Sequence, residues 1–191
     1  MNTAYMYKSV ENEVELALFN GIWTTVWREH GYELEFSENA LERNIIFTEK
    51  GEAVGTSELK PYYEDSRSSI NEVAPFALHP WVLQAQGKVG ESDKIALLSS
   101  YRGKGTYTDD VLSSICASAA KFNLTCMVSL LEPVFMRALR ILYKVPMQKL
   151  GEKTFYKGDY VVPAVMDVGY INEHPEQFTW YKKFATAAST K

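Results

Sequence analysis

Apolar residues recur at helical spacing near the start of the chain. Asn12 stands three residues before Glu15, which is the spacing of a capping box, and Gly31 follows the run as a C-terminal stop. The pattern predicts a helix over residues 12–29. Its apolar face consists of Val14, Leu18, Ile22 and Val26.

Two short apolar runs follow, with a polar turn over residues 49–52 between them. Residues 44–48 and 53–59 therefore predict a β-hairpin. Segment 61–72 is polar and is predicted to be a loop. Segment 73–89 is apolar enough to be packed, but two prolines interrupt it and its pattern favours neither a helix nor a strand.

The second half of the chain alternates buried strands with helices. Residues 94–99 and 126–131 are short apolar runs that predict buried strands. After the first strand, a glycine-containing turn opens a helix that reaches about Lys121. After the second, Pro133 opens a helix that reaches about Tyr143, because proline is favoured at the first helical position.

The C-terminal part predicts two strands and a short helix. Residues 153–156 and 160–168 have strand character, and a short helix is expected from Pro175, with a frayed tail at about 185–191. This order of elements predicts an α/β (α+β) fold, a mixed sheet with helices on its faces, in one domain spanning residues 1–191.

Composition agrees with a globular protein and limits its partners. The 191 residues are 46% hydrophobic and 23% charged, with a net charge of −4. This balance argues against binding to nucleic acid or anionic membranes, so an anionic ligand needs a local site. No apolar run approaches the roughly 20 residues of a membrane span, and the N-terminus lacks an apolar signal core.

The two cysteines, Cys116 and Cys126, lie in apolar segments without metal-ligand spacing. They are predicted to be buried free thiols, which fits a reducing, cytoplasmic compartment, and no metal is expected. His30, His79 and His174 show no partner spacing. Because no Ser-His-Asp arrangement is visible, a covalent enzyme intermediate is not supported.

Residues 95–106 carry the most chemical information. A buried strand leads into Arg102-Gly103-Lys104-Gly105-Thr106 and then into a helix. A helix N-terminus offers unpaired N–H groups and a partial positive charge, and glycines allow close approach to a pyrophosphate. Arg102 and Lys104 add cations. An ordinary strand-to-helix turn is the alternative. A P-loop and a dinucleotide fingerprint are excluded, because their glycine spacing is absent.

The segment Arg102–Gly105 resembles the [RQ]-x-x-G-x-[GA] pyrophosphate loop of GNAT acyltransferases. The order of elements over residues 12–168 resembles that fold, as do Val54-Gly55-Thr56 and the late Leu142-Tyr143-Lys144 segment. The resemblance implies a GNAT-like, mostly antiparallel sheet with a splayed central strand pair. It also implies an acyltransferase that uses acyl-CoA or acetyl-CoA, or the phosphopantetheine of acyl carrier protein.

Residues 91–97, Glu-Ser-Asp-Lys-Ile-Ala-Leu, resemble the E-x-S-R run of acyl-homoserine-lactone synthases and long-chain N-acyl amino acid synthases. In those families the run directly precedes the phosphate loop, as it does here. Glu91 corresponds to their catalytic-site glutamate, and Lys94 stands where an arginine is usual. The resemblance thereby favours a long acyl chain delivered by acyl carrier protein.

The expected reaction is direct attack of a primary amine on a thioester. Glu91 is the first candidate for the base and Glu132 the second, although Glu132 also suits helix N-terminal stabilisation. Tyr143 corresponds to the family's late tyrosine and is the candidate acid for the thiolate. Backbone groups of Leu97, Leu98 and Ser99 are expected to pair with the pantetheine arm as an added strand would.

Two further interpretations remain open. One is a non-catalytic acyl-CoA-binding or regulatory module on the same fold. The other is a different fold in which the Arg102–Gly105 turn is purely structural. The pattern identifies neither the small-molecule amine acceptor nor the oligomeric state.

Overall fold

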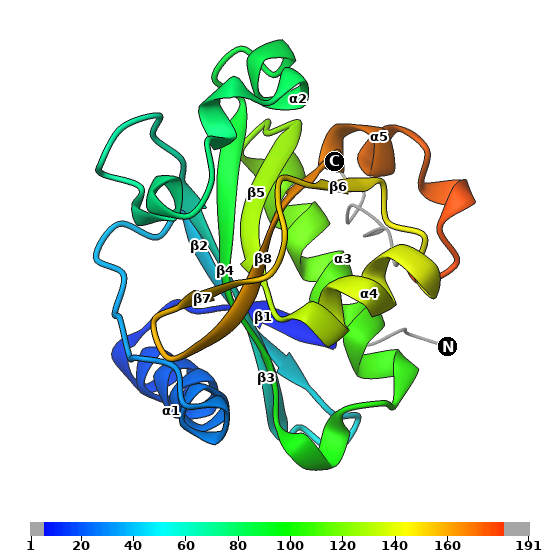
Figure 1. Cartoon of the computed structure of the whole chain (residues 1–191). Helices are drawn as coiled ribbons and strands as arrows, with labels where there is room; N and C mark the ends of the chain where they lie inside the picture. The colour runs from blue at the N-terminus through cyan, green and yellow to red at the C-terminus, as the bar shows by residue number, and fades with distance from the viewer. Residues whose placement is uncertain (1–5, 182–191) are drawn as a thin grey trace.

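An eight-stranded, mostly antiparallel sheet runs through the molecule (Figure 1). The computed structural model describes residues 6–181, so the predicted tail at 185–191 lies outside the described residues. The strand order is β1-β2-β3-β4-β5-β8-β6, and β7 pairs with β8. The strands are β1 (Tyr7–Ser9), β2 (Glu42–Phe47), β3 (Ala53–Pro61), β4 (Val89–Leu97), β5 (Cys126–Leu131), β6 (Met147–Lys149), β7 (Thr154–Tyr156) and β8 (Asp159–Met166).

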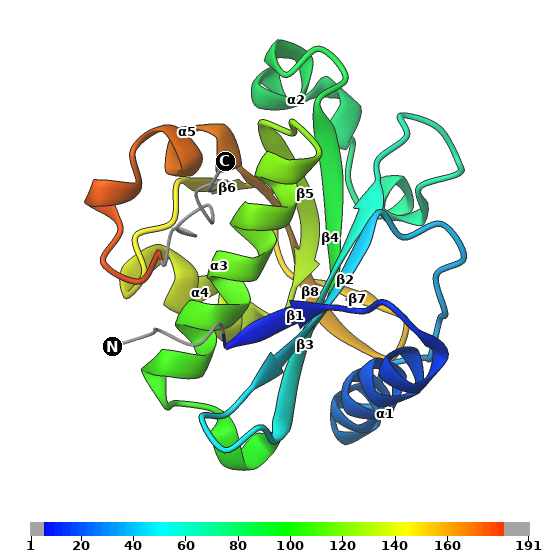
Figure 2. The ribbon, with the colours of Figure 1, turned by 180° about the vertical axis from the view of Figure 1, so that it is seen from behind.

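Helices cover both faces of this sheet (Figure 2). The α-helices are α1 (Glu13–His30), α2 (Pro80–Gln84), α3 (Gly105–Lys121), α4 (Pro133–Ile141) and α5 (Val168–Glu173). Short 3-10 turns are η1 (Ser69–Glu72), η2 (Phe76–Leu78), η3 (Ser99–Tyr101) and η4 (Pro175–Gln177). The predicted α/β class with a GNAT-like sheet is confirmed.

Successive side chains of a strand point to opposite faces of the sheet, so their packing partners show which helices cover each face. Ile46 of β2 packs in one cluster with side chains of α3, α4 and α5. Its neighbour Ile45 packs in another cluster with Phe19 and Trp23 of α1. A third cluster joins η1, η2 and α2 to β5 and β8 through Val128 and Val165. The ambiguous segment 73–89 is therefore a packed cover of short helical turns.

Helix α1 begins and ends as its sequence predicts. The Asn12 side chain accepts the Glu15 N–H at 3.0 Å, and Gly31 closes the helix in the left-handed conformation with φ of 80°. The reciprocal bond of a capping box is displaced by one residue, because the Glu15 carboxylate accepts the N–H of Glu11 at 2.8 Å. Two backbone N–H groups at the start of α1, those of Glu11 and Glu15, are thus satisfied by side chains.

Strands β4 and β5 are parallel neighbours that pair over three positions and then separate. The pairs are Val89↔Cys126, Gly90↔Met127 and Glu91↔Val128. Beyond them, the register with β3 shifts, and Lys94 takes a positive φ of 47°. This is a β-bulge, which turns the rest of β4 away from β5. The predicted splayed central pair is confirmed.

Several predicted boundaries were wrong. The central strand begins at Val89 rather than residue 94, because its polar residues are buried against partners from β3. The last strand ends at Met166, and Val168 already belongs to α5. Strands β1 and β6 were not predicted. Each has only three residues, too few for an alternating pattern to stand out.

Candidate functional site

A largely apolar cavity of about 660 Å³ lies where β4 and β5 separate. Its walls come from the C-terminal end of α1, the splayed ends of both strands, the start of α3, one face of α4 and the β7–β8 hairpin. Apolar lining residues from these elements include Val26, Leu97, Val111, Leu131 and Phe135. The cavity therefore exists because β4 and β5 do not remain paired.

One end of the cavity is the N-terminus of α3. Arg102, Gly103 and Gly105 line it, and Gly103 adopts a positive φ of 74°. The turn from Arg102 to Thr106 is exposed, and no acceptor within residues 6–181 takes the backbone N–H groups of residues 103–106. Several donors and the positive helix end thus remain available to an anion.

The two aspartates in the first turns of α3 do not face this end of the cavity. Thr108 and Val111 line the cavity, whereas neither Asp109 nor Asp110 does, and Asp110 is fully buried. Lys104 and Thr106 also lie off the lining. The Lys104 ammonium sits 5.2 Å from the centroid of the Tyr101 ring. Of the two predicted loop cations, Arg102 is the one that the fold brings to the cavity.

Arg102 already has two partners. Its Nε donates to the carbonyl of Leu97 at 2.8 Å, and its Nη2 forms an ion pair with Glu29 of α1 at 2.6 Å. Both charged side chains are partly exposed, so water screens this pair. The Leu97 bond fixes the direction of the guanidinium, while the Glu29 contact is one that a stronger anion can replace.

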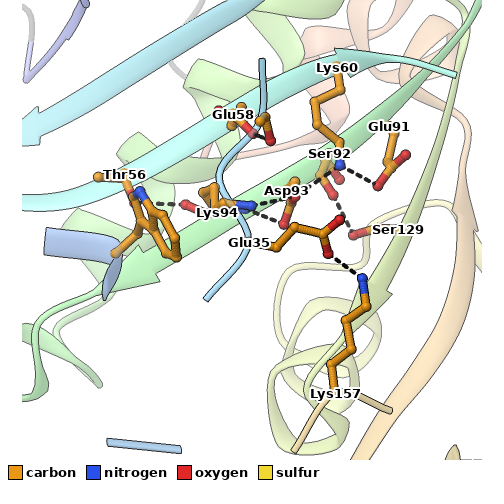
Figure 3. Close-up of polar contacts among 12 residues, drawn as sticks. Glu35, Thr56, Glu58, Lys60, Glu91, Ser92, Asp93, Lys94, Ser129 and Lys157 are labelled. Carbon is orange, nitrogen blue, oxygen red and sulfur yellow. Dashed lines mark hydrogen bonds and ion pairs between the residues drawn. The ribbon is translucent and has the colours of Figure 1, made fainter. Parts of the chain in front are cut away.

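At the opposite, polar end of the cavity, four charged side chains form a chain of ion pairs (Figure 3). Lys60 of β3 contacts Glu91 at 2.9 Å and Asp93 at 3.1 Å. Lys94 contacts Asp93 at 2.8 Å. The β3–β4 register sets Lys60 directly opposite Glu91, so strand pairing delivers the cation to the carboxylate.

The two carboxylates of this chain differ in acidity. Burial raises the pKa of Glu91 above its usual value, and the nearby ammonium of Lys60 offsets only part of that effect. Burial acts in the same direction on Asp93, but Lys94 and Lys60 outweigh it and hold the pKa of Asp93 well below its usual range. Glu91 is consequently the carboxylate with the greater affinity for a proton.

Lys94 is buried more deeply than a lysine usually is. Its side chain is 4% exposed, and its ammonium lies 4.8 Å from the centroid of the Trp23 ring in α1. The bulge at this residue turns the side chain toward Asp93 and α1, and Thr56 donates its hydroxyl to the Lys94 carbonyl at 2.7 Å. Lys94, at the position where the families that residues 91–97 resemble carry an arginine, thus links the sheet to α1.

The second candidate base, Glu132, lines the cavity but caps α4. Its carboxylate accepts the N–H of Val134 at 2.9 Å and that of Phe135 at 2.8 Å. Tyr143 also lines the cavity, half-buried, and its carbonyl accepts the indole N–H of Trp180 at 2.8 Å. The structure therefore brings Glu91, Glu132 and Tyr143 to one cavity, with the Glu132 oxygens already occupied.

Of the three residues whose backbone was predicted to contact the pantetheine arm, only one lies at the cavity. Leu97 lines the cavity, but Leu98 and Ser99 do not. The Leu98 N–H donates to the Val54 carbonyl at 2.9 Å on the β3 side. Because successive strand residues direct their backbone groups to opposite sides, the N–H of Leu97 faces the gap toward β5. Ile95 is related to Leu97 by the same alternation, and it lines the gap as well.

A rim of the cavity joins two segments that are distant in sequence. The Glu33 N–H donates to the Lys157 carbonyl at 2.8 Å, and the Lys157 ammonium pairs with Glu35. Tyr32 donates its hydroxyl to the Tyr160 carbonyl at 3.2 Å. The segment after α1 is thereby held against the β7–β8 hairpin.

Sequence reasoning missed Lys60, Glu35 and Lys157. Lys60 was placed at the edge of a predicted loop, and its role depends on the β3–β4 register, which hydrophobic pattern alone does not fix. Glu35 and Lys157 are 122 residues apart and meet only in the folded chain. No local signal in the sequence marks them.

A second hollow of about 510 Å³ lies on the other side of α4. Four basic side chains line it, together with one carboxylate, Glu152, that pairs with Lys149 at 2.9 Å. We call this region the basic groove. Its cations are Arg137, Arg140, Lys149 and Lys153.

No family model and no curated protein matches the sequence. Solved structures do match its fold. FeeM, an N-acyl amino acid synthase from uncultured soil microbes, matches with a TM-score of 0.65 and 13% identity, over 91% of this chain and 94% of that chain. TofI, solved in a ternary complex with an inhibitor and MTA, matches with a TM-score of 0.62 and 14% identity, over 85% and 91%.

BjaI, a CoA-dependent acyl-homoserine lactone synthase solved with SAM and isopentyl-CoA, matches with a TM-score of 0.58 and 11% identity. The match covers 91% of this chain and 90% of that chain. Acyl-homoserine lactone synthases and an N-acyl amino acid synthase are the groups that residues 91–97 resemble, so the expected likeness is confirmed. At these identities it establishes the fold alone.

The described residues contain neither a membrane-spanning helix nor a metal-ion cluster. No helix within residues 6–181 is long and apolar enough to cross a membrane. In the same part of the chain, no group of three His, Cys, Asp or Glu side chains is arranged to hold a metal ion. Cys116 and Cys126 are buried free thiols, as predicted, and burial raises the pKa of each to about 12.

Proposed function

We propose that this protein is an N-acyltransferase that moves an acyl group from a phosphopantetheine thioester to a primary amine. One observation carries the proposal. A single apolar cavity has an open helix N-terminus at one end and a buried carboxylate, Glu91, at the other. The first fits the diphosphate of an acyl donor and the second fits an amine that must lose a proton.

The chemistry follows from this arrangement. The neutral amine nitrogen attacks the thioester carbonyl carbon, and the backbone N–H of Leu97 or Ile95 stabilises the resulting oxyanion. Glu91 takes the proton from the nitrogen, directly or through water, and its raised pKa makes it a stronger base than an exposed carboxylate. The carbon–sulfur bond breaks, an amide forms, and Tyr143 supplies the proton that the leaving thiolate takes.

For the donor, we propose acyl carrier protein rather than free acyl-CoA. The basic groove supports this choice, because a chain with a net charge of −4 gathers four cations beside the helix that walls the cavity. Such a surface complements a carrier protein with an acidic surface. The cavity volume and its apolar lining support an acyl chain longer than acetyl.

A non-catalytic binding module is the second candidate. The ion pair between Lys60 and Glu91 supports it, since a carboxylate held by an ammonium is also a purely structural feature. The two candidates share the donor site and differ in whether Glu91 accepts a proton.

Changing Glu91 to Gln separates them. We expect donor binding, measured by calorimetry with long-chain acyl-CoA and acyl carrier protein, to persist. Turnover, measured as thiol release with a panel of primary amines, should fall by about 10²- to 10⁴-fold, the usual contribution of a general base. Glu173→Gln, on the exposed end of α5, is the matched control and should behave as wild type.

Three results contradict the proposal in different ways. Full turnover in Glu91→Gln refutes the role of Glu91. Donor binding by the wild type without thiol release, for any amine, supports the binding module instead. Failure of the wild type to bind every donor refutes the donor site itself.

A further inference from the structure

The cations of the cavity are all committed to protein carboxylates. Within residues 6–181, the Lys and Arg side chains that line it are Lys60, Lys94, Arg102 and Lys157. Each forms an ion pair: Lys60 with Glu91 and Asp93, Lys94 with Asp93, Arg102 with Glu29, and Lys157 with Glu35. A free carboxylate that enters the cavity therefore meets no cation without a partner.

Carboxylates also outnumber these cations along the lining. Five acidic side chains face the cavity: Glu33, Glu35, Glu91, Asp93 and Glu132. Near Glu91, the charges of Lys60, Lys94, Glu91 and Asp93 balance, and toward the rim Lys157 pairs with Glu35 (Figure 3). Glu33 adds a further carboxylate to the lining. The field at this end is neutral to negative, so it favours a positive or neutral ligand over an anion.

Exchanging a partner at the polar end is costly. Lys94 is 4% exposed and the side chain of Glu91 is 9% exposed, so water reaches neither well. An incoming carboxylate that captured Lys60 would leave Glu91 buried without its cation, and one that captured Lys94 would take a cation from the half-buried Asp93. Two lining cations, Arg102 and Lys157, are in partly exposed pairs. Arg102 lies at the α3 end of the cavity, and Lys157 shares its rim with two carboxylates, Glu33 and Glu35.

From this charge balance we infer that the acceptor is a primary amine without a free carboxylate, such as an alkylamine, a diamine, or an amino-acid amide or ester. The inference rests on the proposed function and specifies its second substrate. A protonated amine is attracted to the acidic rim, and it reaches Glu91 as the group that removes its proton.

The test compares amines that differ only in the carboxylate. For the wild-type protein with acyl carrier protein or long-chain acyl-CoA as donor, kcat/KM is measured for leucine, leucinamide and isoamylamine, and for phenylalanine, phenylalaninamide and phenethylamine. Amides have less basic amines than acids, whereas the alkylamines do not, so the third member separates charge from basicity. We expect both carboxylate-free members to exceed the acid by about tenfold or more, the effect of building a site against an unwanted charge.

A variant links the preference to the ion-pair chain. Asp93→Asn releases Lys94 and part of Lys60, so we expect the ratio of amine to acid to fall several-fold toward unity. Asp65→Asn removes a comparable carboxylate from an exposed pair with Arg67, neither of which lines the cavity, and should leave the ratio unchanged. If Asp93→Asn does not fold, as judged by thermal unfolding, the wild-type comparison decides alone.

The outcomes are distinguishable. Equal or better use of the free acids by the wild type overturns this inference and leaves the acyltransferase proposal intact. An unchanged ratio in folded Asp93→Asn overturns it as well, because the ion-pair chain is then not its cause. Absence of turnover with every amine, despite donor binding, overturns the acyltransferase proposal together with this inference.

Discussion

Arg102 connects three parts of the site through one guanidinium. It is held by the Leu97 carbonyl at the end of β4 and by Glu29 at the end of α1, and it lies beside the open N–H groups of α3. An exposed ion pair is worth little, so the diphosphate of the proposed donor would displace Glu29 at small cost. The residue is positioned before the ligand arrives.

Removing this side chain should weaken donor binding without unfolding the protein. In Arg102→Ala we expect the donor KM to rise by about 10- to 100-fold, the loss of one or two charge-assisted hydrogen bonds. The thermal midpoint should stay within a few degrees of wild type, because the Glu29 pair is screened. Steady-state kinetics with saturating amine and a thermal melt measure the two effects.

Arg28→Ala provides the control for Arg102→Ala. Arg28 is an exposed residue of α1 that does not line the cavity, so its loss changes net charge equally but removes no predicted phosphate contact. Equal changes of donor KM in the two variants would show that overall charge, rather than the contact, is responsible.

Glu91 and Asp93 show how neighbours decide the chemistry of identical functional groups. Both are carboxylates of β4, two residues apart, and both contact Lys60. Asp93 has a second ammonium, that of Lys94, and its pKa falls, whereas burial dominates at Glu91 and raises its pKa. Their division into a structural anion and a candidate base is therefore set by Lys94.

Among the secondary elements, the β7–β8 hairpin depends on two glycines that touch. Gly158 has φ of 106°, and a Cβ built there would lie 2.1 Å from the carbonyl oxygen of Gly31. Gly31 is the C-cap of α1, so this contact is where the hairpin meets the segment that closes the cavity rim. A side chain at Gly158 would therefore move one of the two elements, whereas a Cβ at Gly31 would lie at an ordinary 3.7 Å from the Gly158 carbonyl oxygen.

Gly158→Ala should therefore be strongly destabilising. The strained φ costs about 1–3 kcal/mol, and the overlap with the Gly31 backbone adds to it, because backbone atoms cannot rotate away. Gly51→Ala is the matched control, since Gly51 has a similar positive φ of 81° but nothing within 4 Å of a built Cβ. Urea unfolding should give a clearly larger loss of unfolding free energy for Gly158→Ala, and equal losses would refute the close contact.

Elements with a sustained apolar period are the ones that sequence predicts well. Helix α1, the hairpin β2–β3 and strand β5 lie within a few residues of their predicted bounds. Strand β4 was predicted five residues too short at its start, because Glu91 and Asp93 look exposed when read alone. In the fold, Glu91 is buried and Asp93 is half-buried, and both pair with Lys60, which is a tertiary compensation.

The candidate site likewise has one end that local sequence signals predict and one end that depends on tertiary structure. The grouping of Arg102 and the glycines at the N-terminus of α3 was predictable because these residues are contiguous in sequence. The polar end was not, because it requires strand register, a bulge at Lys94 and the meeting of Glu35 with Lys157. The family resemblance made Glu91 a candidate base, and only the fold shows that Lys60 faces it.

At the scale of the whole molecule, charge is distributed unevenly. Residues 133–153 contain five Lys or Arg residues and one carboxylate, although the chain as a whole has a net charge of −4. Helix α4 separates two hollows. Its Val134, Phe135 and Ala138 line the apolar cavity, and its Arg137 and Arg140 line the basic groove. A partner bound in the basic groove is thus one helix away from the proposed reaction site.

Reversing the charge of this groove should affect a carrier-bound donor and spare a free one. In Arg137→Glu/Arg140→Glu we expect KM for acyl carrier protein to rise by about 10-fold or more, with strong dependence on ionic strength, while KM for acyl-CoA of the same chain length stays within about twofold. Lys50→Glu/Lys88→Glu changes net charge equally at exposed sites outside the groove. Because α4 is common to both hollows, a rise in KM for both donors would mean that the helix has moved, and a rise for neither would assign the donor to acyl-CoA.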